Sequence, residues 1–468
     1  MTVDALVGAL VAALGERAVL QSPEDRARFE TGWRYGKGIA RCVVRPASTA
    51  EVATALRLCQ EHGARVVAQG ANSGLVAAST PDASGSMVVL SLERLNQTIE
   101  LDQHGRTVLV DGGVLLSQLN EALLPHGLWF PVDLGADPQI GGMIATNTGG
   151  TRLLKYGDVR HNLLGVEVVL GDGRVVSALN RLRKNNTGLD SKHLFVGTSG
   201  VFGIVTRAVL QVAPKPRQRA VALVGCNSGA AVLNLLQTLE RDLADVLSAF
   251  EVMSAAALGP VLDHQPNLPR PFAQLPAYSV LVELSSTLSS ELLSLDDVLE
   301  EQLGAHLEVA GDEVPDIVMH RGEEFWQMRH HISESLRSVG KMLAFDISVP
   351  RSQLPAFTEA VHTMLAAEFP VVRLCDYGHW GDGGTHLNLV WDESKAGVPA
   401  AQLVAALQPR IYDLAVRDFA GSYSAEHGVG PHNQRFYDLY TDENVKALCG
   451  SLRQWCDPDR LLGTVRLD

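Results

Sequence analysis

The stretch PVDLGADPQIGGMIATNTGG, from Pro131 to Gly150, is unusually long and rich in small residues. Glycine has no Cβ atom, so a glycine-rich backbone can approach a ligand closely. The stretch therefore predicts a loop that lines a large planar ligand. A plain surface turn would use similar residues, so this interpretation needs support from the rest of the chain.

A second loop, Gln69-Gly70-Ala71-Asn72-Ser73-Gly74, follows a strand predicted for residues 65–68. Such a loop exposes backbone N–H groups that can hold a pyrophosphate. Neither GxGxxG nor GxxxxGK[ST] occurs at a strand-to-helix turn, which argues against the common NAD and ATP folds. A helix predicted between Ser48 and Gly63 starts at a capping sequence and lies between two strands, as in a βαβ unit.

A polar, proline-bearing connector at residues 213–219 is the best domain boundary in the chain. Beyond it, strands separated by long helices predict an α+β layer with helices on one face of an antiparallel sheet. We therefore expect a first domain at residues 1–215, a substrate domain at 216–418, and a helical C-terminal segment at 419–468 that completes the site.

Composition limits the class of protein. The chain has 468 residues, of which 46% are apolar and 20% charged, as in a soluble protein of two or three domains. A net charge of −14 argues against a nucleic-acid surface. Six cysteines without CxxC spacing favour reduced thiols and a cytoplasmic location. Residues 1–20 predict an amphipathic helix rather than a targeting leader, and no apolar run reaches the ~20 residues of a membrane-spanning helix.

Residues 378–388, with the sequence GHWGDGGTHLN, carry the polar groups of a candidate site. The run at 380–384 is too rich in glycine for a helix and predicts a tight turn that folds His379 back beside His386. If the chain continues as a strand, Asn388 lies on the same face as His386. The segment therefore predicts two imidazoles and a carboxamide close together.

A second polar group lies at residues 424–430, with the sequence SAEHGVG. Glu426 and His427 are neighbours and should point apart, so Glu426 would join His379 and His386 at a metal and His427 would act as a base. These ligands suit Zn²⁺, but Fe²⁺, Mn²⁺ and Co²⁺ also use them. Alternatively each histidine only bonds a turn backbone, although grouping in glycine-rich loops favours a functional site.

The order of these motifs resembles the PCMH-type FAD-binding domain of the vanillyl-alcohol oxidase superfamily. The downstream histidine and Glu-His motifs resemble the D-2-hydroxyacid dehydrogenase branch of that superfamily, and the likeness covers almost the whole chain. The fold that this implies is α+β, with a PCMH-type domain, an antiparallel-sheet substrate domain and a C-terminal helical segment. The segments that carry the resemblance are residues 44–46, 69–74, 131–150, 156–157, 194–206, 379–388 and 426–427.

The resemblance implies that residues 69–74 hold the FAD pyrophosphate and that two later loops line the rest of the cofactor. Many relatives tether the flavin through a histidine in the first loop, whereas this chain has Ala71, Asn72 and Ser73 there. Noncovalent FAD is therefore expected. The implied cofactor residues are Gln69, Gly70, Ala71, Asn72, Ser73, Gly74, Pro131, Asp133, Leu134, Gly135, Gly141, Gly142, Thr146, Asn147, Gly149, Gly150, Gly200, Gly203 and Ile204.

The resemblance also implies a substrate-binding role for Arg329, Ser333, Asn388 and His427. Arg329 would grip a carboxylate, and Ser333 lies four residues further along one face of a probable helix. The family usually has a lysine where this chain has Ala344. Either Lys341 or Arg373 is a candidate to replace that lysine.

The implied reaction is oxidation of a D-2-hydroxy acid to its 2-oxo acid, with hydride transfer to flavin N5 and His427 as base. D-2-Hydroxyglutarate is the first choice of substrate, and D-lactate and D-malate are alternatives. An electron-transfer flavoprotein, a quinone or oxygen would reoxidise the flavin, the first two being the partners expected, and a homodimer is expected. A metal-dependent hydrolase would use the same metal ligands but leaves the glycine-rich first half unexplained, and a flavin-fold protein without net redox chemistry is a third hypothesis.

Overall fold

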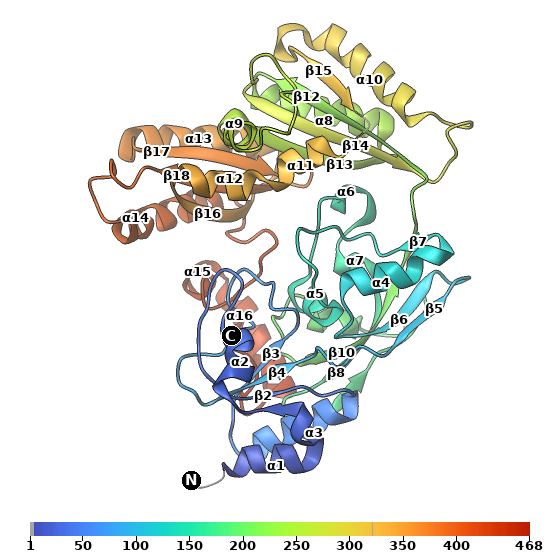
Figure 1. Cartoon of the computed structure of the whole chain (residues 1–468), viewed down its shortest axis with the longest axis vertical. Coiled ribbons are helices and arrows are strands. Elements are labelled where there is room, and N and C mark those ends of the chain that lie inside the picture. The colour runs from blue at the N-terminus through green and yellow to red at the C-terminus, as the bar shows by residue number, and fades with distance from the viewer. Residues whose placement is uncertain (1–3, 321) are drawn as a thin grey trace. The chain divides into compact units, whose positions relative to one another are not determined.

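The computed structural model describes residues 4–320 and 322–468, which form two compact units (Figure 1). The first unit contains Met1–Gly149, Gly157–Lys215 and Glu426–Asp468, and the second contains Gly150–Tyr156 and Pro216–Ala425. The passage from Lys215 to Pro216 lies inside the predicted connector. The segment predicted from residue 419 joins the first unit only from Glu426 onward.

The first unit has two main sheets and a small pair of strands. In the sheet of order β1-β2-β4-β3, strands β2, β4 and β3 run parallel and β1 runs antiparallel to β2. The sheet of order β5-β6-β10-β8-β9 is antiparallel throughout. The strands are β1 (Val19–Leu20), β2 (Ala40–Val44), β3 (Val66–Gln69), β4 (Met87–Ser91), β5 (Ile99–Asp102), β6 (Thr107–Asp111), β7 (Leu128–Trp129), β8 (Leu163–Val169), β9 (Val175–Ser177), β10 (Ile204–Gln211) and β11 (Ala213–Pro214).

Helix α3 connects β2 to β3, as the predicted βαβ unit requires. It begins where Ser48 Oγ accepts a hydrogen bond from Glu51 N at 3.2 Å, while Glu51 Oε2 accepts one from Ala47 N at 2.8 Å. This reciprocal capping explains the start of the helix. The helices of this unit are α1 (Ala5–Leu14), α2 (Pro23–Glu30), α3 (Thr49–Glu61), α4 (Leu116–Leu123), α5 (Ile140–Thr146), α7 (Val159–Asn162), α15 (Gln434–Tyr440) and α16 (Glu443–Cys456).

The second unit is built on a seven-stranded antiparallel sheet of order β15-β12-β14-β13-β17-β18-β16. Strands β13 and β17 are neighbours in this sheet although a long stretch of chain separates them. The strands are β12 (Gln218–Cys226), β13 (Leu247–Ser254), β14 (Tyr278–Ser286), β15 (Ile317–His320), β16 (Lys341–Ser348), β17 (Val372–Gly378) and β18 (Gly384–Trp391).

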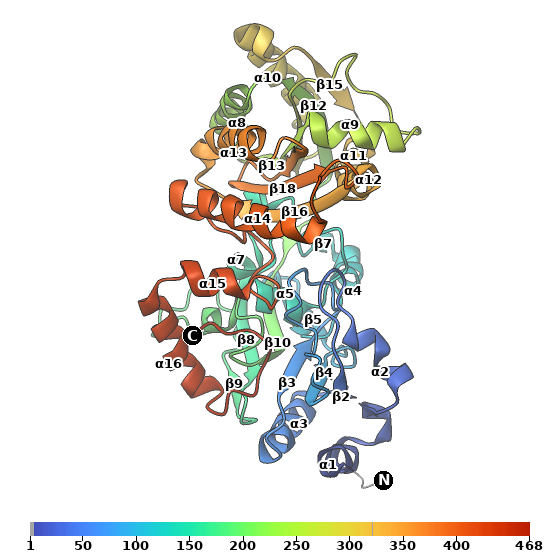
Figure 2. The same ribbon diagram turned by 90° about the vertical axis from the view of Figure 1, so that its left-hand side faces the viewer.

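Helices cover both faces of this sheet, so the expectation of helices on one face is wrong. Figure 2 shows α8 and α13 on one side of the sheet and α9, α11 and α12 on the other. Every residue of β13 is buried, which requires cover on both faces. The helices are α6 (Leu153–Tyr156), α8 (Gly229–Leu243), α9 (Ala255–His264), α10 (Leu295–Ala310), α11 (Glu324–His330), α12 (Ile332–Val339), α13 (Leu354–Glu368) and α14 (Ala400–Asp413).

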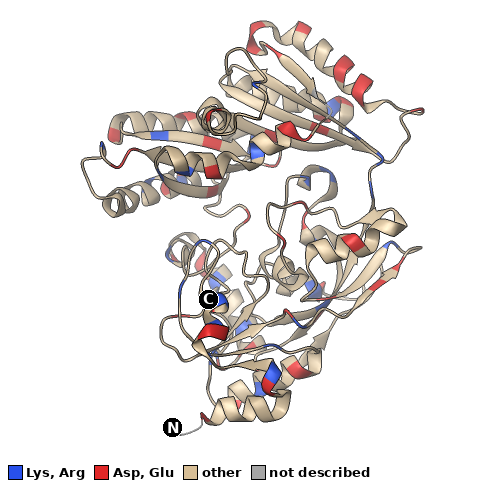
Figure 3. Cartoon of the chain, viewed as in Figure 1, with Lys and Arg blue, Asp and Glu red and all other residues tan. Residues whose placement is uncertain are grey.

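Helix α10 carries several of the acidic residues that give the chain its negative charge. Its buried residues include Leu295, Leu299 and Leu303, spaced one helical turn apart. Acidic residues recur along the rest of this helix, where the ribbon is red (Figure 3). The helix is therefore amphipathic and adds negative charge to the surface. None of the helices in the described part of the chain has the length and apolar character that a membrane crossing requires.

Candidate functional site

Side-chain hydrogen bonds fix the shape of the loop that follows β3. Gln69 is 2% exposed, and its Nε2 donates to the carbonyl oxygens of Phe29 at 2.9 Å and Ser79 at 2.8 Å. Asn72 has a φ of 56°, in the left-handed region that asparagine tolerates. Its Nδ2 donates to Thr31 O at 2.8 Å, and its Oδ1 accepts from Ser79 Oγ at 2.9 Å. The loop is thus held in one conformation by its own polar side chains.

The backbone N–H groups of residues 70–75 are available to a ligand. Within the described chain, none of them donates a hydrogen bond to another protein group. A Cβ atom built on Gly74 would meet nothing within 4 Å. The loop therefore presents unpaired donors beside open space, which suits the two phosphates of a dinucleotide.

The start of α5 faces the same loop. A Cβ atom on Gly70 would lie 3.3 Å from Gln139 Oε1 and 3.8 Å from Gly142 Cα. Gln139 is 5% exposed, and its Oε1 has no hydrogen-bond partner. A Cβ atom on Gly142 would meet nothing within 4 Å. The structure therefore brings residues 69–74 and Gly141-Gly142 together, and it adds Gln139, which the sequence analysis did not single out.

The segment around residues 197–204 lies against both α5 and β3. Gly197 N and Ser199 N donate to the carbonyl oxygens of Ile144 at 3.1 Å and Ala145 at 2.8 Å. A Cβ atom on Gly200 would lie 3.7 Å from Ala68 Cβ. The segment needs left-handed backbone at Gly200 (φ 77°) and Gly203 (φ 148°). Glycine is the residue that adopts this conformation without strain, so both positions favour glycine for a local reason.

The remaining predicted cofactor residues lie at the two ends of the long loop. Pro131 is buried, and Leu134 packs against the core that includes Ile140 and Met143. Asn147 has a φ of 50° and donates from Nδ2 to Asp158 Oδ2 at 2.8 Å. The loop is therefore tied into the first unit at both ends. The other predicted members of this set are Asp133 and Gly135 before α5, Thr146 at the end of α5, Gly149 and Gly150 after it, and Ile204, which begins β10.

The open space at Gly142 gives a direct test of the cofactor cradle. We expect Gly142→Leu to give folded protein that has lost at least tenfold in FAD affinity, because the side chain would fill the cradle while leucine suits a helix better than glycine. Flavin absorbance after gel filtration and a melting curve measure the two effects. Gly304→Leu is the matched control, since Gly304 also lies in a helix with nothing within 4 Å of its Cβ position. Full flavin occupancy in Gly142→Leu would remove this position from the cradle.

In the second unit, the turn between β17 and β18 brings the two histidines together as the glycines predict. Gly384 N and Asp382 N donate to His379 O at 3.1 and 3.0 Å, and Gly383 has a φ of 95°. The rings of His379 and His386 meet edge to face with centroids 5.2 Å apart. The side chain of Asn388 is 1% exposed, and its Nδ2 donates to His386 O at 3.1 Å. The turn therefore assembles the predicted pair of imidazoles.

A buried carboxylate, which the sequence analysis did not single out, connects His379 to Arg329. Glu251 in β13 is 1% exposed; its Oε1 lies 2.5 Å from His379 Nδ1, and its Oε2 accepts from Arg329 Nε at 2.8 Å. Burial would raise the pKa of Glu251, but the charges of His379 and Arg329 outweigh burial and lower it. A signal was present in the sequence, because a glutamate inside the apolar run of β13 must find a partner.

Arg329 and Ser333 do not lie on one helix as expected. Helix α11 ends at His330 and α12 begins at Ile332, so the two residues belong to consecutive helices. Both nevertheless reach Tyr377. The Arg329 guanidinium lies 4.4 Å from the centre of the Tyr377 ring, and Ser333 Oγ is 2.6 Å from its hydroxyl. Tyr377 in strand β17 therefore contacts both Arg329 and Ser333, although these two residues belong to separate helices.

Cross-strand pairing arranges the site in rows on one face of the sheet. Asp346, His386 and Tyr377 form one row across β16, β18 and β17, and the next row contains Ala344, Asn388 and Cys375. Residues directly opposite one another share a face, and rows on that face repeat about every 6.8 Å. The methyl group of Ala344 therefore lies beside Asn388, one row from His386.

The register distinguishes the two candidate replacements for the family's lysine. Lys341 is an odd number of residues from Ala344, so it projects to the opposite face; it pairs with Glu393 at 3.4 Å. Arg373 shares the face of Tyr377. Burial raises the pKa of Cys375, and the positive charge of Arg373 opposes this increase. Arg373 is therefore on the face of the sheet that carries Cys375 and Asn388.

The Glu426-His427 dipeptide is held by hydrogen bonds on both sides. Ala425 N donates to Asp346 O at 3.2 Å, which fixes the residue before the dipeptide to β16. Two residues after His427, Val429 O accepts from Ser199 Oγ at 2.8 Å. The chain passes from the second unit to the first at this dipeptide, since Ala425 ends the one and Glu426 begins the last segment of the other.

Two sets of side chains have the spacing of metal ligands. The potential ligand atoms of His379, His386 and Glu426 lie within 4.8 Å of one another, and so do those of Asp346, His386 and His427. Two histidines and one carboxylate in either set match the ligands that zinc prefers. His379 belongs to the first set only and has its Nδ1 beside a carboxylate, an arrangement that commonly orients a metal-binding histidine.

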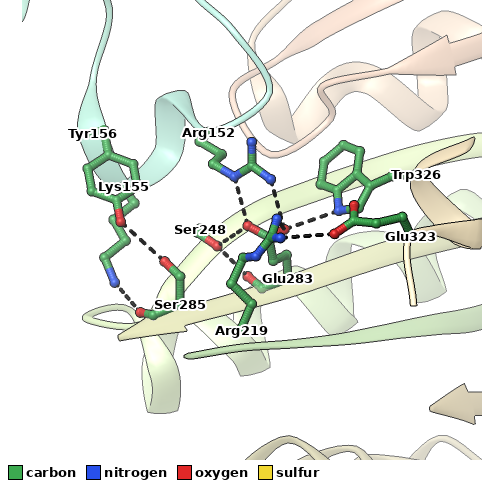
Figure 4. A network of polar contacts seen from close by, with 9 residues as sticks. All are labelled: Arg152, Lys155, Tyr156, Arg219, Ser248, Glu283, Ser285, Glu323 and Trp326. Carbon is green, nitrogen blue, oxygen red and sulfur yellow. Dashed lines mark hydrogen bonds and ion pairs between the residues drawn. The ribbon is translucent and has the colours of Figure 1, made fainter. Parts of the chain in front are cut away.

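A second buried acid lies on the same face of the sheet. Glu283 in β14 has no exposed surface and binds Arg152 through two bonds of 2.9 and 3.0 Å (Figure 4). It also accepts from Ser248 Oγ at 2.8 Å and Trp326 Nε1 at 3.1 Å. Arg152 follows directly on the predicted cofactor loop at Gly149-Gly150. The network therefore anchors this short segment inside the second unit.

Comparison with known families identifies the class of protein. Residues 40–179 match the family model described as an FAD binding domain, and residues 215–465 match the C-terminal domain of FAD linked oxidases. The chain belongs to the FAD-linked oxidase family and is an FAD-dependent oxidoreductase. The loop of unpaired amides beside Gly142 fits such a cofactor.

Curated relatives narrow the class further. The chain is 33% identical to D-2-hydroxyglutarate dehydrogenase of Rattus norvegicus over 448 residues, which cover 95% of this chain and 81% of that protein. It is 32% identical to D-2-hydroxyglutarate–pyruvate transhydrogenase of Saccharomyces cerevisiae, with 94% and 89% of the two chains covered. The expected cytoplasmic location is wrong by this comparison, because the similar proteins of Rattus norvegicus, Bos taurus, Danio rerio and Arabidopsis thaliana are named as mitochondrial.

Solved structures share the fold. Alkyldihydroxyacetonephosphate synthase superposes with a TM-score of 0.73 at 16% identity, covering 100% of this chain and 86% of that one. p-Cresol methylhydroxylase superposes with a TM-score of 0.72 at 16% identity, with coverage of 97% and 94%. The expected α+β architecture with a PCMH-type FAD-binding domain is therefore confirmed.

Proposed function

We propose that the protein oxidises a D-2-hydroxy acid to the corresponding 2-oxo acid, with D-2-hydroxyglutarate as the preferred substrate. The observation that carries this proposal is the connection of Arg329 to His379 through Glu251. A guanidinium that binds carboxylates thereby lies on the same sheet face as a pair of imidazoles of the kind that bind metals. A 2-hydroxy acid offers a carboxylate and a hydroxyl on adjacent carbons, as this pair of sites requires.

FAD is held noncovalently by residues 69–74, Gly141, Gly142 and the 200–204 segment in this proposal. Bound FAD supplies the acceptor for the hydride that leaves C2 of the substrate. The unpaired N–H groups of residues 70–75 bind the pyrophosphate, and the buried Oε1 of Gln139 accepts a hydrogen bond from the cofactor. An electron-transfer flavoprotein or quinone as acceptor, and a homodimer, stay predictions from the family resemblance.

The chain's own residues bind the substrate and move one proton. Arg329 binds the C1 carboxylate through its two terminal nitrogens, and Asn388 and Ser333 help to orient it. A ring nitrogen of His427 accepts the proton of the C2 hydroxyl. A divalent metal held by His379, His386 and Glu426 would supply positive charge that lowers the pKa of that hydroxyl. As the C=O bond forms, the hydroxyl proton goes to His427 and the C2 hydride would go to the flavin.

An anaerobic titration tests this function. The purified protein should be yellow, and D-2-hydroxyglutarate should bleach its flavin absorption band at about 450 nm. D-Malate and D-lactate should bleach it at higher concentrations. Prior treatment with a chelator should abolish the bleaching, and zinc should restore it. A flavin band that no hydroxy acid changes would contradict the proposal, and a colourless hydrolase would favour the alternative class.

Arg373 offers a specific test of the preference for a dicarboxylate. It lies in β17 on the face that carries Cys375 and Asn388, and their row is about 6.8 Å from the row of His386. Four C–C bonds of about 1.5 Å give a five-carbon diacid a comparable reach. We expect Arg373→Met to raise KM for D-2-hydroxyglutarate about 10- to 100-fold, the value of a hydrogen bond to a charged group, and to leave KM for D-lactate unchanged.

Lys341→Met is the matched control for this measurement. Lys341 projects to the opposite face of the sheet, so its removal should change neither KM. Equal increases for both substrates in Arg373→Met would mean that Arg373 supports the structure rather than the distal carboxylate.

A further inference from the structure

Both carboxylate oxygens of Glu251 contact predicted site residues. Oε1 lies 2.5 Å from His379 Nδ1, and Oε2 lies 2.8 Å from Arg329 Nε. The side chain is 1% exposed and lies inside strand β13. An unpaired carboxylate would be very costly in such a position, so the two contacts determine whether this residue can be buried at all.

The contact with His379 has a chemical consequence. A carboxylate only accepts hydrogen bonds, so Nδ1 of His379 must carry the proton in this contact. In a neutral ring, Nε2 then carries the lone pair with which a histidine binds a metal. The edge-to-face contact with His386, with centroids 5.2 Å apart, brings the second imidazole to the same place.

The contact with Arg329 has a parallel consequence. Glu251 engages Nε, and among the described residues no hydrogen-bond partner is found for the two terminal nitrogens of Arg329. The ring of Tyr377 supports the guanidinium at 4.4 Å. The planar pair of terminal N–H groups is therefore held ready for a carboxylate.

We propose that Glu251 is a positioning residue that sets the proton position of His379 and the orientation of Arg329 at once. This inference rests on the proposed function and adds to it a physical link between the metal ligand and the substrate-binding arginine. One side chain then determines both the affinity for the metal and the affinity for the substrate carboxylate.

Glu283 provides a matched control on the same face of the sheet. It lies opposite Ala249 on the neighbouring strand and is also fully buried against an arginine. Its carboxylate contacts Arg152, Ser248, Trp326 and Arg219, and none of these is a predicted site residue. Loss of its charge should reduce stability without a specific effect on the metal.

The experiment compares Glu251→Gln with Glu283→Gln in the FAD-loaded protein. A glutamine has one oxygen, so it can accept from His379 or from Arg329 but not from both in the present geometry. We expect Glu251→Gln to lower zinc affinity 10- to 100-fold, as loss of a carboxylate behind a metal-binding histidine does. KM for D-2-hydroxyglutarate should rise together with this loss. Glu283→Gln should keep zinc affinity within about twofold of wild type.

The outcomes separate this inference from the proposed function. Zinc binding by the wild-type protein with unchanged affinity in Glu251→Gln would overturn the role of Glu251 alone. A wild-type protein that binds no zinc would contradict the proposed metal site and the His379 part of this inference together. A lower zinc affinity with an unchanged KM would overturn the link to Arg329.

A measurement on the wild-type protein covers the case in which Glu251→Gln does not fold. Nitrogen-15 NMR of zinc-loaded protein with labelled histidines distinguishes a protonated Nδ1 from a metal-bound one. The His379 signals are assigned by their loss in His379→Gln. We expect a protonated Nδ1 and a zinc-bound Nε2 for His379, and zinc bound through Nδ1 would overturn the inference.

Discussion

Replacement of His427 by alanine should lower turnover with D-2-hydroxyglutarate at least ~10²-fold, because a general base contributes 10²- to 10⁴-fold to such reactions. FAD and metal should be retained, since the proposed metal ligands are His379, His386 and Glu426. The neighbouring backbone should also keep its place, because Asn433 bonds both Gly428 O at 2.9 Å and Gly430 N at 2.8 Å. Steady-state turnover, flavin absorbance and zinc content of the same preparation measure these effects.

A control variant makes the assignment of His427 specific. His104→Ala, at an exposed turn of the first unit, should leave activity unchanged. Turnover within threefold of wild type in His427→Ala would exclude the histidine as the base. Loss of zinc in the same variant would instead support the ligand set of Asp346, His386 and His427.

Replacement of Arg152 by methionine should destabilise the second unit by about 3–5 kcal/mol, the cost of leaving a buried charge without its partner. Glu283 has no exposed surface, and Arg152 is 8% exposed in their ion pair. Arg219 lies 3.7 Å from the same carboxylate but is 44% exposed, so water already screens its charge. Denaturant unfolding followed by the fluorescence of the six tryptophans, one of which is Trp326 bonded to Glu283, measures the change.

A pair of controls separates the charge from the packing. Arg219→Met should cost less than about 1 kcal/mol, as for other exposed ion pairs. The double variant Arg152→Met with Glu283→Leu should recover most of the stability lost in Arg152→Met, because an apolar pair avoids the desolvation of both charges. Equal losses in the single and double variants would mean that shape, rather than charge, dominates at this position.

Features that depend on a few neighbouring residues could be predicted from the sequence. The turn that pairs His379 with His386 follows from the glycines between them. The start of α3 follows from the capping residues Ser48 and Glu51. In both cases the interactions that stabilise the structure lie within a few residues in the chain.

Helix boundaries near the site were harder to predict. The spacing of Arg329 and Ser333 suits one helix, yet the helix is interrupted at His331. Contacts with Tyr377 on β17 hold both side chains, and a tertiary contact of this kind can outweigh local helix preference. The spacing therefore predicted that the two residues lie close together, but it predicted the wrong element.

The sequence by itself predicts the glycine-rich loops, the histidine turn and the connector at residues 213–219. Backbone freedom and local hydrogen bonds determine these features, and both act over a few residues. The sequence does not predict the partners of the buried acids. Glu251 meets His379 across 128 residues and Arg329 across 78, and Glu283 meets Arg152 across 131. These contacts depend on which strands lie side by side and in which register, so only the folded sheet could pair each buried carboxylate with its cation.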